Sequence, residues 1–72
     1  MKATVKNVED HRYFCHYVDV CYEGNWIRFD TAYRASGFLR DKREKDGPIE
    51  IEWIDITHTA KKSHVYPSYY TI

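Results

Sequence analysis

Hydrophobic and polar positions along the chain predict five strands and one helix. Alternation over residues 2–8 predicts a first strand, and polar residues after it indicate a turn. Residues 12–22 are rich in aromatic and β-branched side chains, which favour a pleated strand. Residues 49–57 and 65–72 have the same character, although Pro67 restricts the last strand to an edge or a bend.

The dipeptide Gly24-Asn25 is a hairpin signal that follows the strand at 12–22. A two-residue turn there places Asp19 opposite Asp30, and it sorts the apolar side chains to one face. The apolar face holds Phe14, Val18, Val20, Tyr22, Ile27 and Phe29. The second face holds Tyr13, Cys15, Tyr17, Asp19, Cys21, Trp26, Arg28 and Asp30. Facing carboxylates repel each other unless water solvates them, so we expect the second face to be wet.

A helix is predicted to follow, with Asp30 or Thr31 as its N-cap. Its apolar stripe is formed by Ala32, Ala35, Phe38 and Leu39. Residues 40–46 are all charged and continue the helix as a solvated face, unless the helix is short and a charged loop follows it. Gly47-Pro48 then ends the helix.

The isoleucines of the fourth strand fall into two pairs that point to opposite faces of a regular strand. Ile49 and Ile51 occupy odd positions, and Ile54 and Ile56 occupy even positions. A β-bulge near Trp53 would bring all four to one face, and we expect such a bulge. The β-β-β-α-β-β order then predicts one α+β domain over residues 1–72. Its small antiparallel sheet has about four to five strands, with one helix on the apolar face.

Composition indicates a foldable chain with a small core. The chain has 72 residues, with seven Tyr, three Phe and two Trp. A chain of this length buries only about 60% of the surface that its unfolded form exposes, so a partner or a second copy would help to stabilise it. Lysine and arginine together number 11, as do aspartate and glutamate, which argues against duplex nucleic-acid binding through phosphates alone.

The sequence predicts neither a membrane partner nor secretion. No apolar run is long enough to span a bilayer. The residues after Met1 lack the apolar core of a secretory signal, so we expect a cytoplasmic protein with reduced thiols.

The sequence predicts no catalytic, cofactor-binding or metal-binding residues. Cys15 and Cys21 share a face of one strand but stand about 20 Å apart at ~3.3 Å per residue, which is too far for a disulfide or a shared metal ion. His16 points to the face opposite Cys15, which prevents the two from acting as nucleophile and base. The glycines are too scattered for a phosphate-binding loop.

The aromatic side chains of the wet face are the strongest functional signal. We expect Tyr13, Tyr17, Trp26 and Arg28 to form a binding surface, because Tyr, Trp and Arg dominate the energetics of protein interfaces. The prediction is a non-enzymatic protein that inhibits or adapts a larger protein, or that forms a homodimer. Small chains of this kind are common among phage and mobile-element accessory proteins, an expectation that rests on size.

Two alternatives remain. The same rings, with Arg and Lys beside them, could stack on single-stranded nucleic acid, which predicts binding that weakens with salt. The carboxylates of Asp19 and Asp30 on that face count against phosphate binding. The rings could also pack under the terminal segments, which would remove the surface.

Overall fold

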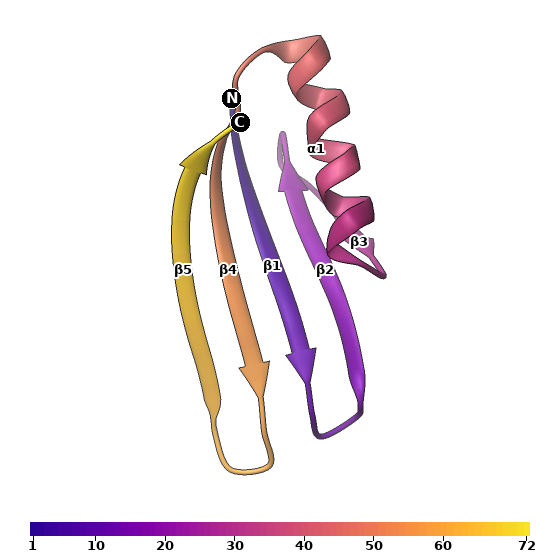
Figure 1. Ribbon diagram of the computed structural model, residues 1–72, viewed down its shortest axis with the longest axis vertical. Coiled ribbons are helices and arrows are strands. Elements are labelled where there is room, and N and C mark those ends of the chain that lie inside the picture. The colour runs from indigo at the N-terminus through magenta and orange to yellow at the C-terminus, as the bar shows by residue number, and fades with distance from the viewer.

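The computed structural model describes all 72 residues and has the predicted element order. The elements are strands β1 (Lys2–Asp10), β2 (Cys15–Tyr22) and β3 (Asn25–Phe29), helix α1 (Ala32–Asp46), and strands β4 (Glu50–His58) and β5 (Ser63–Thr71). The five strands form one sheet, and α1 lies against one of its faces (Figure 1). The predicted α+β class and the β-β-β-α-β-β order are confirmed.

The strand order in the sheet is β3-β2-β1-β4-β5. Three of the four pairings are antiparallel, and the central pairing of β1 with β4 is parallel. The parallel pair arises because α1 carries the chain back to the end of the sheet where β1 begins (Figure 1). Lys2 is therefore paired with Glu50 at the start of both strands.

The β2–β3 turn is Glu23-Gly24, one residue earlier than the predicted Gly24-Asn25. Both turn residues have a positive φ, 52° at Glu23 and 78° at Gly24. Two consecutive residues with positive φ are typical of the type I′ turn, whose twist matches that of the paired strands. As a result Tyr22 pairs with Asn25.

The observed register corrects the predicted pairing of two carboxylates. Asp19 lies opposite Arg28 and not opposite Asp30. An ion pair thereby replaces a repulsive pair, which favours this register. Because each partner shifts by two residues, the side chains of the paired strands keep their predicted faces.

Strand β2 begins at Cys15, three residues later than predicted. The Asp10 carboxylate accepts a hydrogen bond from the backbone N–H of Arg12 at 3.0 Å and two from its guanidinium, at 3.0 and 2.9 Å. Such local bonds favour a turn over a continued strand. Tyr13 and Phe14 therefore lie in a turn, and Phe14 is 95% exposed instead of facing the core.

The helix has the predicted boundaries. Thr31 Oγ1 accepts a hydrogen bond from the backbone N–H of Arg34 at 3.2 Å, which caps the N-terminus. At the other end the Gly47 N–H donates to the Arg43 carbonyl at 2.8 Å. The charged residues 40–46 continue the helix, so the longer of the two predicted helices is confirmed.

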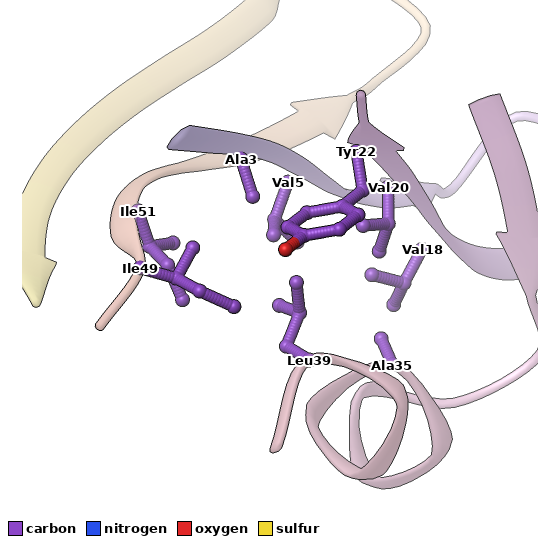
Figure 2. Close-up of a cluster of buried hydrophobic side chains, with 9 residues drawn as sticks. All are labelled: Ala3, Val5, Val18, Val20, Tyr22, Ala35, Leu39, Ile49 and Ile51. Carbon is purple, nitrogen blue, oxygen red and sulfur yellow. The ribbon is translucent and has the colours of Figure 1, made fainter. Parts of the chain in front are cut away.

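The core lies between α1 and the half of the sheet where β1 and β4 begin. Ala35 and Leu39 point from the helix toward the strands, as Figure 2 shows. Phe38 and Ala32 of the predicted stripe pack against the same cluster and are partly buried. The nine buried side chains are Ala3, Val5, Val18, Val20, Tyr22, Ala35, Leu39, Ile49 and Ile51.

The predicted bulge near Trp53 is wrong. Strand β4 pairs without interruption through Trp53 with both β1 and β5. Regular pairing keeps the alternation of side chains, so Ile51 faces the helix while Ile54 and Ile56 face away from it. The helix therefore buries only two of the four isoleucines, Ile49 and Ile51.

Candidate functional site

One face of the sheet has no covering layer, and we call it the open face (Figure 1). Side chains alternate between faces along a strand, so the neighbours of the core residues point to the open face. The residues of the open face are Lys2, Thr4, Lys6, Val8 and Asp10 of β1, Cys15, Tyr17, Asp19 and Cys21 of β2, Trp26 and Arg28 of β3, Glu50, Glu52, Ile54, Ile56 and His58 of β4, and Ser63, Val65, Pro67, Tyr69 and Thr71 of β5.

An apolar row crosses the open face. The strand registers align Tyr17, Val8, Ile56 and Val65 side by side on β2, β1, β4 and β5. Val8 is only 4% exposed because its neighbours shield it, whereas Val65 at the edge is 56% exposed. Ile54 adds a further half-buried aliphatic side chain in the adjacent row.

The two central strands change their apolar face at the same level. In β1 the apolar side chains move from the helix side at Val5 to the open face at Val8. In β4 they move from Ile51 and Trp53 on the helix side to Ile54 on the open face. The half of the sheet beyond the core therefore has its apolar side chains on the open face. Neighbouring side chains cover Val8 there, whereas no second layer covers Ile54, Ile56 and Val65.

The helix side of that same half is polar. Asn7 Nδ2 donates to Asp55 Oδ1 at 2.8 Å, and Trp53 Nε1 donates to the same oxygen at 3.0 Å. His16 Nε2 lies 2.6 Å from Asn7 Oδ1. Side chains from three strands thus satisfy one another, an arrangement that the sequence pattern does not indicate because they are far apart along the chain.

Three of the four predicted site residues lie on the open face. Arg28 donates to Asp19 through Nε at 2.8 Å and through Nη2 at 3.0 Å. Its Cζ also lies 3.9 Å from the centre of the Tyr17 ring. The hydrogen bond to Asp19 raises the pKa of Arg28 above its ordinary value. Arg28 therefore has its charge paired with Asp19 and its guanidinium against the Tyr17 ring.

Trp26 lies farther along the same face and is 53% exposed. The Nζ of Lys6 is 5.1 Å from the centre of its ring, within the range of a cation–π contact. Lys6 is not among the predicted site residues, because its contact with Trp26 spans β1 and β3 with β2 between them.

Tyr13 does not belong with the other three. It lies in the β1–β2 turn, 73% exposed, and Arg12 Cζ is 5.5 Å from the centre of its ring. The hydrogen bond from Arg12 lowers the pKa of Asp10 in the same turn. The open face therefore brings together Tyr17, Trp26 and Arg28 without Tyr13.

Sequence reasoning also missed the aliphatic part of the open face. The expected bulge assigns Ile54 and Ile56 to the core, and the pattern places Val8 in an ordinary first strand. The sequence does contain an indication, because the apolar side chains of β1 and β4 change from odd-numbered to even-numbered positions part-way along each strand. Recognising one apolar surface from these two changes requires knowing that β1 and β4 are neighbours.

One pair of side chains has the composition of a hydrolytic dyad. His58 Nδ1 lies 2.6 Å from Ser63 Oγ at the far end of the sheet. Asp10 is the register partner of His58, but both oxygens of its carboxylate accept hydrogen bonds from Arg12. An oriented triad needs a carboxylate that holds the imidazole, and here Arg12 occupies it. No group of three or more His, Cys, Asp and Glu side chains is placed to hold a metal ion.

No family model matches the chain, and neither a curated protein nor a solved structure is significantly similar to it. The helix is too short and too polar to cross a membrane.

Proposed function

We propose that this chain is a small non-enzymatic binding protein that docks a protein surface through the open face. The contact is centred on the apolar row, with Tyr17, Trp26 and Arg28 around it. Docking of this kind fits an inhibitor or adaptor, including those of phage and mobile-element origin. We propose the cytosol as its compartment, since both cysteines are free thiols.

The observation that carries the proposal is the change of apolar face in β1 and β4. A sheet covered on one side normally directs its apolar side chains to that side and polar ones to water. Here Val8, Ile54 and Ile56 point to the side that has no second layer. Contiguous apolar surface flanked by Tyr, Trp and Arg is typical of protein contact sites.

Single-stranded nucleic acid fits this surface less well. Bases stack on aromatic faces that are free, with basic side chains beside them for the phosphates. Arg28 already covers Tyr17 and is neutralised by Asp19, and Lys6 lies over Trp26. A protein partner could bind to the open face while all of these contacts stay intact.

Affinity capture with matched variants tests the proposal. Val65 and Tyr66 are neighbours on β5, are 56% and 63% exposed, and point to opposite faces of the sheet. We expect wild type and Tyr66→Glu to retain the same protein from an extract of the source cells, and Val65→Glu to lose it.

Two results would contradict the proposal. Equal retention by all three proteins would place binding elsewhere on the molecule. Salt-sensitive binding of labelled single-stranded oligonucleotides that is lost in Trp26→Ala would replace the protein partner with nucleic acid.

A further inference from the structure

We infer that the protein surface that covers the open face is the open face of a second copy of this chain. The inference rests on the proposed function and names the partner. Two copies would pack sheet on sheet about 10 Å apart, with the two helices on the outside. Three features of the open face support this partner: its register, its charges and its area.

The register makes the apolar row complementary to itself. The row has two members on each side of a line that runs between β1 and β4. A two-fold axis along that line would place Val8 against the partner's Ile56. It would also place Tyr17 against the partner's Val65. Such self-complementarity is what an isologous dimer requires.

The charges of the open face agree with the same axis. Residues of β1 would face the partner's residues of β4 at the same level, because the two strands are parallel and in register. Lys2 would then face the partner's Glu50. Asp10 would lie opposite the partner's His58, but its carboxylate is already paired with Arg12 of its own chain and adds no charge pair. Lys6 would face the partner's Ile54, on which its aliphatic stem can pack. No pair of like charges is opposed along these two strands.

The area of the overlap is close to that of a small specific interface. The axis brings β2, β1, β4 and β5 of the two copies face to face and leaves β3 without an opposing strand. Four strands spaced about 4.8 Å apart, with up to nine residues at ~3.3 Å each, present roughly 570 Å² in flat projection, and the relief of the side chains adds accessible surface to this. A specific interface buries roughly 600–1,000 Å² on each partner, so all of the open face on these four strands would be used. The formal net charge of zero adds no long-range repulsion between copies.

Pairing through the outer edge of β5 is the competing arrangement. Ile49 and Ile72 exchange both backbone hydrogen bonds. Since bonding alternates along an antiparallel pair, Pro67 falls at a position whose backbone faces the free edge. Proline has no N–H to donate there, which interrupts an edge-to-edge ladder in its middle. The structure therefore favours the face over the edge.

Sedimentation velocity at micromolar concentration gives the first test. We expect wild type and Tyr66→Glu to sediment at twice the mass of one chain. We expect Val65→Glu to raise the dissociation constant at least tenfold, because each dimer would bury two uncompensated carboxylates. Val65 is half-exposed at the sheet edge, so the variant should fold, and far-UV circular dichroism checks this.

A charge-rescue experiment tests the axis itself. Tyr17→Lys and Val65→Glu are each expected to be monomeric, and Arg28 beside position 17 adds to the repulsion of the new cation. When mixed, they should form a one-to-one heterodimer, because the new ammonium group at position 17 of one chain would meet the new carboxylate at position 65 of the other. The wild-type contact between Tyr17 and Val65 is kept at the second, symmetry-related position. Native mass spectrometry distinguishes the heterodimer from either homodimer.

The outcomes separate the inference from the proposed function. A wild type that stays monomeric at high micromolar concentration overturns the second copy as partner. The capture experiment then decides independently whether Val65 is needed to hold another protein. A dimer that persists in Val65→Glu overturns the face-to-face arrangement, and failure of the mixed variants to associate overturns the axis.

Discussion

At the scale of single residues, Tyr22 ties the end of β2 to the end of α1. Its side chain is 4% exposed, and its hydroxyl donates to Asp46 Oδ2 at 2.7 Å. Burial, with the hydrogen bond and the negative charge of Asp46, raises the pKa of Tyr22 to about 12. Ionisation of the phenol would place an anion beside a carboxylate where the sheet meets the helix.

This pKa predicts a loss of stability at alkaline pH. The unfolded chain releases the Tyr22 proton near its ordinary value of 10.0, whereas the folded chain holds it to about 12. The stability from Tyr22 is therefore fully present below pH 10 and is lost as the pH rises toward 12. We expect Tyr22→Phe to show a shallower alkaline decline in the thermal midpoint, measured by circular dichroism.

Tyr13→Phe is the matched control, because Tyr13 is exposed in a turn. It should decline as steeply as wild type. Equal alkaline profiles for the two variants would contradict the role given to Tyr22. Tyr69 and Tyr70 also have a raised pKa, so Tyr22→Phe should remove only part of the alkaline decline.

The residues of the open face could be predicted in part. Alternation along the strands correctly places Tyr17, Trp26 and Arg28 on one face, because a face depends only on odd or even position. The partner of Arg28 could not be predicted, because it depends on which two residues form the turn. The polar residues that follow residues 2–8 indicate a turn, but nothing in the sequence shows that the contact between Asp10 and Arg12 extends this turn to Tyr13.

At the scale of elements, the β2–β3 hairpin depends on a glutamate in an unfavourable conformation. Glu23 adopts a φ of 52°, a region that asparagine tolerates better. We expect Glu23→Asn to stabilise the protein by about 0.5 kcal/mol, since Asn-Gly suits a type I′ turn. Urea unfolding measures the change. No change, or a loss of stability, would contradict the Glu23-Gly24 turn.

The end of α1 gives a second element-scale prediction. Gly47 has φ 88° and ψ −166°, which side chains rarely adopt, although there is open space around its Cα. Gly47→Ala should therefore cost about 1–3 kcal/mol from the backbone alone. Gly37→Ala is the control, because Gly37 lies within α1 with equally open space, and it should stabilise by roughly 0.5–1 kcal/mol. Urea unfolding measures both changes in the free energy of unfolding. If both variants were stabilised, or both destabilised, this interpretation would be contradicted.

The elements themselves are more predictable than their contacts. Periodicity, the cap at Thr31 and the stop at Gly47 are sufficient to define α1. A bulge near Trp53 is expected when β4 is considered alone, because only a bulge brings two apolar phases to one face. The position of Ile54 and Ile56 on the open face is explained only when β4 is placed beside β1, whose Val8 lies on the same face. No local pattern in either strand shows that the chain after α1 pairs with β1.

At the scale of the whole molecule, α1 covers one part of the sheet and leaves an apolar surface on the opposite face. If two copies cover that surface, stability depends on protein concentration. We expect the thermal midpoint of wild type to rise over a hundredfold increase in concentration, and that of Val65→Glu to stay constant. A wild-type midpoint that does not depend on concentration would indicate a protein that is stable alone.

Burial of the open face by a second copy can be observed through the solvent accessibility of methyl groups, measured by NMR with a soluble paramagnetic probe. Val65 and Ile56 report on the open face, and Ile27, which is 39% exposed on the helix side, is the internal reference. We predict that protection of Val65 and Ile56 rises with protein concentration while Ile27 stays accessible. Methyl groups on both faces that remain equally accessible at every concentration would show that no second copy covers the open face.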